Sequence, residues 1–369
     1  MNRPDLAIFL PSLRGGGAER VMLTLAKGLV DRGVTVELVL ADAVGPYMEE
    51  VPSCIPVSNL KSPRVVRSMP GLVRYLRRRR PRAIMSGLER ANIAAVLATM
   101  VARVNTRKIL TVHNTLSRTV DSSLSLRERI IPSLVRLLYP RADAIVAVSK
   151  GAESDLVRWA GVPEERVQTI YNPVLLPDLA VRAAESVDHP WFSDGAPPVV
   201  LGVGRLSPQK DFSTLLKAFA IQRRHQLARL VILGEGEERS RLLTLARELG
   251  IEEDLWMPGF VDNPYKFMSR ASVFALSSAW EGLPTVLIEV LACGTPVVAT
   301  NCPSGPQEIL EGGRWGRLVP VGDAAALGRE LVEAINHLPD GVRDESHLQR
   351  FEISCVVDQY YELLMRRDN

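Results

Sequence analysis

The chain has 369 residues, 46% of them apolar and 24% charged. This composition predicts about two globular domains and excludes collagen-like, disordered and disulfide-scaffold proteins. Its 45 Lys and Arg residues nearly balance 42 Asp and Glu residues, which argues against a general nucleic-acid-binding protein. The four cysteines form no CxxC pair and lack metal-ligand spacing, so we expect buried, reduced thiols in a cytoplasmic protein. The first apolar stretch is too short for a signal peptide, and no run of about 18 apolar residues predicts a membrane span.

Short β-branched runs alternate along the first half of the chain with longer segments of helical periodicity. The segment Ala18–Val30 places Val21, Leu25 and Leu29 on one face, and Gly33 ends it. This alternation is typical of a doubly wound parallel sheet. The strands expected here are Leu6–Leu10, Thr35–Ala41, Ala83–Ser86, Lys108–Val112 and Ala144–Ser149.

A proline-rich stretch, residues 173–198, interrupts the alternation and indicates a linker between domains. The alternation then resumes with strands expected at Val199–Val203, Leu230–Leu233, Val273–Ser277 and Pro296–Thr300, and helices near 211–224, 237–249, 284–292 and 324–337. We therefore expect a Rossmann-like domain over residues 1–175, a linker over 176–196 and a second Rossmann-like domain over 197–350. The amphipathic segment 351–369 predicts a C-terminal helix that packs back toward the first domain.

Three consecutive glycines, residues 15–17, lie where the first predicted strand turns into the first predicted helix. Backbone without side chains lets a ligand approach the positive end of that helix closely. An ordinary tight turn explains the glycines equally well. The run does not match GxGxxG, and the nearest acidic residue, Asp42, lies just past the second predicted strand. A nicotinamide-dependent enzyme is therefore disfavoured.

Two cations follow the first strand of the second domain, Arg205 directly after Gly204 and Lys210 five residues later. At the carboxyl edge of a parallel sheet, a planar guanidinium and a compact ammonium group suit a diphosphate. Taken alone, the two residues are better explained as solvated surface cations.

The sequence from Ala279 to Pro284, AWEGLP, precedes a predicted helix that contains Glu289. Proline fits the first turn of a helix, which leaves Glu281 in the preceding loop. Eight helical steps would set the two glutamates about 80° apart, roughly on one side. Carboxylates accept hydrogen bonds from the paired hydroxyls of a ribose or hexose, and the loop N–H groups can meet a phosphate. A capping Glu281 and a solvated Glu289 are the alternative, which the apolar neighbours of Glu289 disfavour.

Together these features resemble the retaining glycosyltransferases of family 4, which have the GT-B fold, and the resemblance covers nearly the whole chain. Its strongest element is the Glu-x7-Glu pattern within Glu-Gly-Leu-Pro, beside the Gly-Arg…Lys pattern at 204–210. The other elements are Gly-Gly-Ala-Glu-Arg at 16–20, Ala-Asp-Ala-Ile-Val-Ala-Val-Ser at 142–149 and Tyr-Asn-Pro-Val at 171–174. The resemblance implies an α/β protein with two Rossmann-like doubly wound domains facing a central cleft. It also implies a nucleotide-sugar donor held mainly by the second domain.

The resemblance further implies roles for individual residues. Arg205 and Lys210 would bind the donor diphosphate and stabilise the leaving nucleotide. Glu289 would bind the ribose hydroxyls, and Glu281 would contact the transferred sugar. His113, at the end of a predicted strand, matches a sugar-contacting histidine, although a strand-end histidine bonded to backbone is the interpretation without the family. The other implied donor-binding positions are Gly16, Gly17, Gly204, Gly282, Leu283, Pro284 and Thr285.

One position departs from the family pattern, since Asp211 follows the lysine where the family often has glycine; we expect the lysine to keep its role.

The chain contains no D-x-D sequence, which metal-dependent transferases use to hold a diphosphate-bound cation. Cationic side chains and helix ends would do that work here, so we expect no metal and no other cofactor. No nucleophile is evident. The family's retaining reaction is usually described as front-face substitution, in which the leaving phosphate helps to deprotonate the acceptor.

The first domain contains an arginine-rich segment, with eight arginines and no acidic residue within residues 64–82. Leu72, Val73 and Leu76 would form an apolar edge beside them. A basic amphipathic helix suits anionic lipid headgroups or a lipid diphosphate. A solvated helix face is the alternative, and nucleic acid is disfavoured because Tyr75 is the lone aromatic residue there. The residues expected to contact the acceptor or the inner face of the cytoplasmic membrane are Arg74, Arg77, Arg78, Arg79 and Arg80.

The segment CPSGPQEIL at 302–310 resembles a variant found in family members that build bacterial surface glycans, several of which use UDP-linked galactose-type or N-acetylhexosamine donors. We therefore expect a retaining hexosyltransferase that moves a hexose or N-acetylhexosamine from a UDP-sugar to a glycan acceptor. That acceptor is expected to be polyprenyl-diphosphate-linked, in the synthesis of lipopolysaccharide or another surface polysaccharide or glycoconjugate. A nucleotide-sugar 2-epimerase of similar fold and a non-catalytic sugar-binding scaffold are the alternatives. The sequence determines neither the donor sugar, the acceptor and linkage nor the oligomeric state.

Overall fold

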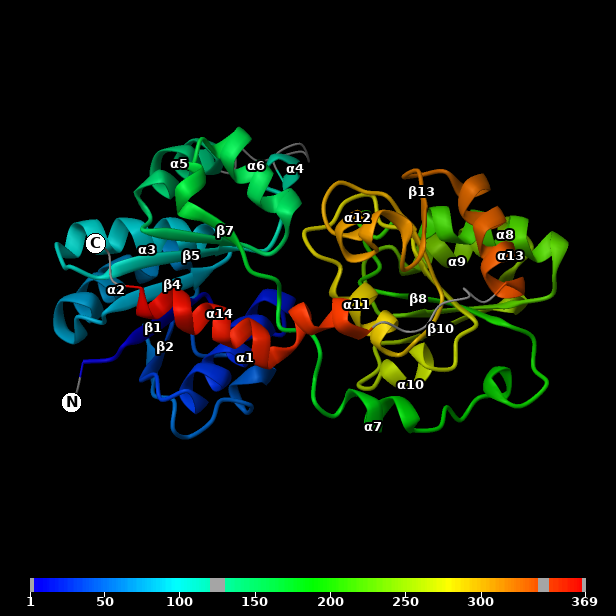
Figure 1. Ribbon diagram of the computed structural model, residues 1–369, viewed down its shortest axis with the longest axis horizontal. Coiled ribbons are helices and arrows are strands. Elements are labelled where there is room, and N and C mark those ends of the chain that lie inside the picture. Colours follow the sequence, from blue (N-terminus) through cyan, green and yellow to red (C-terminus); the bar gives the residue numbers. More distant parts are fainter. Residues whose placement is uncertain (1–2, 120–129, 338–344, 367–369) are drawn as a thin grey trace. The chain divides into compact units, whose positions relative to one another are not determined.

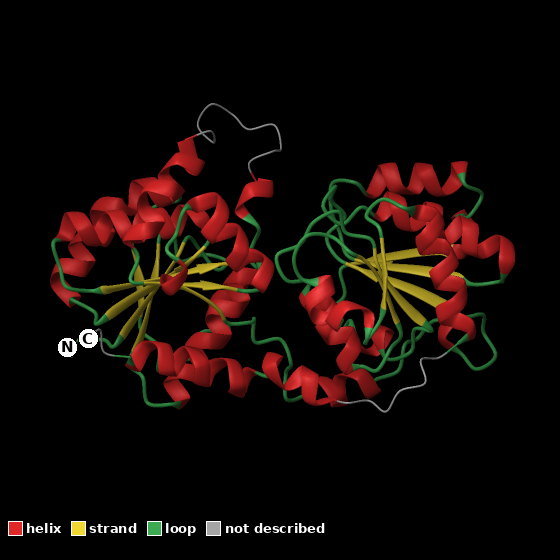
Figure 2. Cartoon of the chain, turned by 45° about the horizontal axis from the view of Figure 1, so that its top comes forward, coloured by secondary structure: helices red, strands yellow, loops and turns green. Residues whose placement is uncertain are grey.

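The computed structural model describes residues 3–119, 130–337 and 345–366. It divides into two compact units, the first formed by Met1–Pro173 with Arg350–Asn369 and the second by Val174–Gln349. Each unit is built around a parallel sheet with helices packed on both faces (Figure 2). This architecture confirms the predicted α/β class. No helix in the described ranges is long and apolar enough to cross a bilayer.

Within the described residues, the sheet of the first unit has seven strands in the order β3-β2-β1-β4-β5-β6-β7 (Figure 1). The order reverses between β1 and β4, and ligands of open α/β sheets bind at the carboxyl ends of strands beside such a reversal. The strands are β1 (Leu6–Leu10), β2 (Val36–Leu40), β3 (Val57–Asn59), β4 (Ala83–Gly87), β5 (Arg107–Val112), β6 (Ala144–Ala147) and β7 (Val167–Thr169). The helices are α1 (Gly17–Asp31), α2 (Val65–Arg79), α3 (Glu89–Ala102), α4 (Leu116–Thr119), α5 (Ile130–Leu138) and α6 (Lys150–Ala160).

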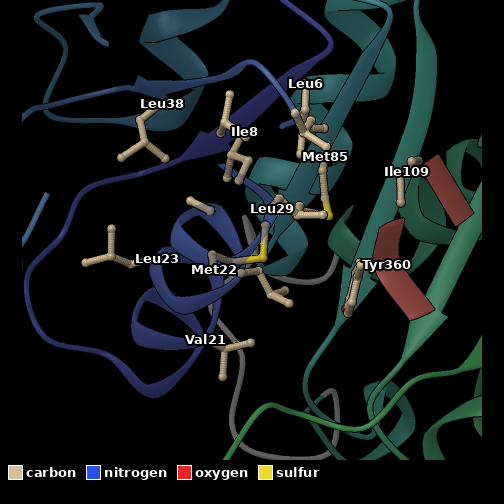
Figure 3. Close-up of a cluster of buried hydrophobic side chains, with 14 of the residues drawn as sticks. Leu6, Ile8, Val21, Met22, Leu23, Leu29, Leu38, Met85, Ile109 and Tyr360 are labelled. Atoms are coloured by element: carbon tan, nitrogen blue, oxygen red, sulfur yellow. The ribbon is translucent and has the colours of Figure 1, made fainter. Parts of the chain in front are cut away.

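The main core of the first unit lies between its sheet and α1, whose apolar face meets side chains of β1, β2, β4 and β5 (Figure 3). Helix α14 (Ile353–Met365), from the far end of the chain, closes this core. Tyr360 is 1% exposed, and a Cβ on Gly28 of α1 would lie 2.5 Å from Val357. Arg32, the C-cap of α1, also pairs with Asp358. The first unit therefore completes its core with the last helix of the chain.

The sheet of the second unit has, in the described part of the chain, six strands in the order β10-β9-β8-β11-β12-β13. The reversal lies between β8 and β11. The strands are β8 (Val199–Val203), β9 (Arg229–Leu233), β10 (Leu255–Gly259), β11 (Val273–Leu276), β12 (Val297–Thr300) and β13 (Arg317–Val319). The helices are α7 (Leu179–Ala184), α8 (Phe212–His225), α9 (Arg239–Glu248), α10 (Tyr265–Met268), α11 (Thr285–Ala292), α12 (Pro306–Ile309) and α13 (Ala324–Asn336).

Residues 176–196, expected to be a linker, cluster with the second unit instead. Helix α7 lies in this stretch and packs on α10, and Asn263 Nδ2 donates a hydrogen bond to Arg182 O at 2.9 Å. Prolines interrupt the sequence pattern without preventing the segment from packing. The chain therefore passes between the units at residues 173–174 and 349–350.

Candidate active site

Three loops lie together at the carboxyl edge of the second unit's sheet. They follow β8, β11 and β12, which are neighbours in the sheet. Ser277 Oγ donates to Lys210 O at 2.8 Å and so joins the second loop to the first. Thr300 Oγ1, at the end of β12, donates to Ser278 O at 2.7 Å. These bonds fix the loops that carry most of the predicted site residues.

Lys210 and Glu281, 71 residues apart in sequence, form an ion pair at the centre of these loops. Lys210 Nζ lies 2.5 Å from Glu281 Oε1, and the two side chains are 17% and 6% exposed. Ser278 Oγ donates to the same carboxylate oxygen at 2.6 Å. A carboxylate buried this deeply requires such partners, because desolvation disfavours an isolated charge. An ammonium group has three protons, so Lys210 retains donors for a ligand phosphate.

Glycines make room for this arrangement. A Cβ on Gly204 would lie 3.2 Å from the Lys210 side chain, so glycine lets the lysine cross the end of β8. In the loop after β9, a Cβ on Gly234 would lie 2.0 Å from Gly204 O, and one on Gly236 would lie 2.2 Å from Leu206 O. The sequence expectations did not include Gly234 and Gly236. A Gly-x-Gly directly after a predicted strand is a signal for such close backbone approach.

Arg205 occupies a different environment from Lys210. Its side chain is 75% exposed and pairs with Glu237, itself 54% exposed, at 3.2 Å. The pKa of Glu237 is lowered, first by a backbone hydrogen bond and then by Arg205. Exposed pairs of this kind are weak because water screens them. The guanidinium can therefore leave Glu237 for a ligand phosphate at little cost.

Helix α11 begins at Thr285 with Pro284 as its N-cap, one residue later than predicted. Glu281 lies before the helix, as predicted, so helical steps do not determine the angle between the two glutamates. Glu289 is in the second turn and is half-buried. Tyr265 Oη donates a hydrogen bond to its carboxylate at 3.3 Å. Glu289 is therefore fixed by a neighbouring element rather than solvated on an exposed face.

The loop before α11 is packed. Gly282, Leu283 and Pro284 are all buried. Ser304 Oγ donates to Gly282 O at 2.8 Å, and a Cβ on Gly305 would lie 2.3 Å from Pro284 Cδ. The side chains of Leu283 and Pro284 are therefore committed to packing, and the backbone here is the part suited to a ligand.

His113 lies in the first unit, directly after β5. Its Nε2 is 3.0 Å from Thr111 Oγ1. Because Thr111 donates to Ser86 O at 3.1 Å, its oxygen is left to accept the His113 Nε2 proton. Burial lowers the pKa of His113 to about 4, against the opposing effect of a hydrogen bond with Asn172. His113 is therefore neutral at pH 7, and it is suited to hydrogen bonding rather than to transferring a proton as a general acid.

The glycine turn of the first unit is occupied by one of its own side chains. Glu19, 7% exposed, accepts hydrogen bonds from Gly15 N–H at 2.9 Å and Gly16 N–H at 3.2 Å. Ser12 Oγ also donates to it, at 3.2 Å. A phosphate reaching this turn therefore meets a carboxylate at Gly16, whereas a Cβ on Gly17 would have no atom of the described residues within 4 Å. The Gly-x-x-Glu spacing of a capping box was the available signal.

Several arginines of the arginine-rich segment have partners within the first unit, which the sequence analysis did not predict. Arg79 Nη2 lies 3.0 Å from the carboxylate of buried Glu37, and Arg82 pairs with Asp5 at 3.2 Å. Although the segment itself contains no acidic residue, acids from other parts of the first unit therefore neutralise two of its arginines. Arg77 Nη2 also donates to a backbone carbonyl, Val101 O, at 3.0 Å.

The predicted apolar edge of this segment is present but faces the core of the first unit. Leu72 and Leu76 are fully buried in the core of the first unit, so they are not available to a membrane. Helix α2 ends at Arg79, with Arg80 in the left-handed conformation at its C-cap. Arg74 and Arg78 remain exposed on the helix.

No group of three or more His, Cys, Asp or Glu side chains among the described residues is placed to hold a metal ion.

Burial raises the pKa of Cys302 to about 12, with Glu281 adding to the effect, so this thiol beside the site stays neutral. Cys54 is exposed, contrary to the expectation of uniformly buried thiols.

Two family models match the chain. Residues 15–176 match the glycosyltransferase family 4 model, and residues 185–340 match the glycosyl transferases group 1 model. A Campylobacter jejuni protein, N-acetylgalactosamine-N,N'-diacetylbacillosaminyl-diphospho-undecaprenol 4-alpha-N-acetylgalactosaminyltransferase, is 33% identical over 336 residues, 88% of each chain. The lipopolysaccharide core biosynthesis glycosyltransferase LpsE of Rhizobium meliloti is 36% identical over 172 residues, 45% of this chain and 49% of its own.

Solved structures agree with this assignment at the level of the fold. Anabaena HepE in complex with UDP has a TM-score of 0.76 and 21% identity, covering 98% of this chain and 99% of its own. Both sequence relatives named above are bacterial sugar transferases, and the two-sheet architecture is that of the solved structure. The chain therefore belongs to glycosyltransferase family 4 and has the GT-B fold.

Proposed function

We propose that the protein is a retaining glycosyltransferase that moves a hexose or N-acetylhexosamine from a UDP-sugar to a polyprenyl-diphosphate-linked glycan. The observation that carries this proposal is the buried Lys210–Glu281 pair beside exposed Arg205, at the carboxyl edge where β8 meets β11. The printed names of the relatives support it, since one acts on a diphospho-undecaprenol-linked glycan and a structural neighbour binds UDP.

In this proposal the bond between the sugar's anomeric carbon and the diphosphate oxygen breaks, and a bond to the acceptor oxygen forms on the same face. The acceptor proton passes to the leaving phosphate. Arg205 and Lys210 neutralise the charge that grows on that phosphate, an interaction that is strongest in the transition state. Glu289 binds the ribose hydroxyls, and Glu281 orients Lys210 and contacts the transferred sugar.

The reaction itself is the first test. Purified protein is incubated with UDP-linked hexoses and N-acetylhexosamines, with and without an undecaprenyl-diphosphate-linked glycan, and UDP release is measured. We expect UDP release with one donor class and an α-linked product by NMR. Interconversion of the donor without transfer would identify an epimerase. Folded protein that binds UDP but releases none from any donor would identify a scaffold.

Metal independence is a separate expectation. In this proposal Arg205 and Lys210 neutralise the donor diphosphate without a cation, so activity should survive EDTA. The measurement is UDP release with EDTA and with added Mn²⁺ or Mg²⁺. Complete loss with EDTA that either cation restores would contradict the proposal, whereas partial stimulation is compatible with relief of product inhibition.

We further propose that α2 holds the protein on the anionic inner surface of the cytoplasmic membrane. Arg74 and Arg78 are exposed, and each arginine near such a surface contributes about 1 kcal/mol. Replacing both with serine should weaken binding to phosphatidylglycerol vesicles by roughly 30-fold at low salt and by less at high salt. The matched control removes the same charge from α8 of the second unit, Lys217→Ser with Arg224→Ser. Equal co-sedimentation of both variants would show that the arginines are only a solvated face.

A further inference from the structure

A small pocket with several polar side chains in its lining lies in the first unit. It is bounded by the ends of β4 and β5 and the start of α3, and its polar lining includes Glu89, Asn92, Thr111, His113 and Tyr139. The space accommodates about one water-sized group. Among these residues, the proposed reaction gives a role only to His113.

A fixed hydrogen-bond network forms one wall of this pocket. Asn92, 1% exposed, accepts from Ser86 Oγ at 2.7 Å and donates to Thr111 O at 3.0 Å. It also donates to Tyr139 Oη at 3.1 Å. The Tyr139 hydroxyl therefore serves as an acceptor here, and within the described residues its own proton has no acceptor. The pocket thus contains an unused donor on a side chain that is fully buried.

Glu89 supplies the complementary group. It is the first residue of α3 and is half-buried, and in the described part of the chain its carboxylate has no hydrogen-bond or ion-pair partner. Leu88, just before it, has φ 78° and ψ 137°, a conformation costly for a side chain with a Cβ. Burial raises the pKa of Tyr139, and the Glu89 charge adds to that effect, so the phenol keeps its proton.

We propose that Glu89 and Tyr139 together bind one hydroxyl group of a sugar substrate. A hydroxyl both donates and accepts, and the pocket offers one unused acceptor, Glu89, and one unused donor, Tyr139. The neutral His113 lines the same pocket without a charge that would compete. This inference rests on the proposed glycosyl transfer, and the hydroxyl belongs either to the donor sugar or to the acceptor glycan.

The test is a double-mutant cycle with Glu89→Gln and Tyr139→Phe, measured as kcat/KM for transfer and as acceptor-free donor hydrolysis. Hydrogen bonds to charged groups are the stronger ones, so Glu89→Gln should lower transfer about 10- to 100-fold and Tyr139→Phe about 3- to 10-fold. The combined variant should lose less than the product of the two, because both groups bind the same hydroxyl. Glu164→Gln, an exposed carboxylate of the same unit, is the charge-matched control and should keep wild-type rates.

The two reactions distinguish the source of the hydroxyl. If it belongs to the donor, hydrolysis falls with transfer; if it belongs to the acceptor, only transfer falls and the acceptor KM rises. Unchanged kinetics in folded Glu89→Gln, checked by thermal unfolding, would overturn the inference and leave the pocket as a water site. Failure of the wild-type protein to transfer sugar at all would count against the proposed function instead.

Discussion

Lys210→Ala should cost the protein both stability and activity. The variant leaves the Glu281 carboxylate, 6% exposed, without its cation, and breaking a buried pair in this way costs about 3–5 kcal/mol. It also removes an ammonium group from the leaving phosphate, so UDP release should fall about 10²-fold or more. Urea unfolding and steady-state UDP release measure the two effects separately.

A second variant separates the two causes. Lys210→Met combined with Glu281→Gln removes both charges while nearly keeping their volumes, and such replacements of buried pairs are often neutral for stability. The double variant should therefore unfold near the wild-type midpoint and remain inactive. If Lys210→Ala alone were as stable as the wild type, the Lys210–Glu281 pair would not be buried in solution. Recovery of activity in the double variant would show that Lys210 has no role in the reaction.

Arg205→Ala should affect activity alone. Its side chain is 75% exposed and its pair with Glu237 is open to water, so stability should change by no more than about 0.5 kcal/mol. Because the guanidinium stabilises charge that grows on the leaving phosphate, kcat/KM for UDP release should fall about 10²-fold or more. Arg205→Lys should recover only part of this loss, since an ammonium group lacks the planar fork.

Glu237→Gln is the matched control for Arg205. It removes the exposed partner while leaving the guanidinium in place, so kcat/KM should stay near the wild-type value. Near-normal kcat/KM in both Arg205→Ala and Lys210→Ala would show that the diphosphate binds elsewhere.

Whether the sequence pattern identifies a strand depends on the position of that strand in its sheet. Central strands such as β1 and β8 are almost fully buried, so they appear in the sequence as continuous apolar runs. The four strands absent from the sequence expectations, β3, β7, β10 and β13, are the sheet edges. They pair on one side only, and Val57 of β3 remains 38% exposed. Their side chains therefore lack the apolar pattern that identifies a strand.

The site was predictable residue by residue but not pair by pair. Local motifs predicted Arg205, Lys210 and Glu281 as site residues because each follows a strand that the sequence pattern identifies. Their partners come from elsewhere in the fold, as the Lys210–Glu281 contact depends on β8 and β11 being neighbours. The same holds for Arg79, whose partner Glu37 is 42 residues away. Such contacts are set by sheet order, which local spacing does not contain.

Ribosomes deliver the two parts of the first unit at different times. Residues up to Pro173 emerge before the whole of the second unit, whereas α14 is synthesised after it. Until it arrives, the strip of α1 around Gly28 lacks the Val357 and Tyr360 side chains that cover it. The second unit has its main core within Val200–Ala334 and can close earlier. The core of the first unit is thus completed only after the second unit has been synthesised, and until then this apolar face of α1 lacks its cover.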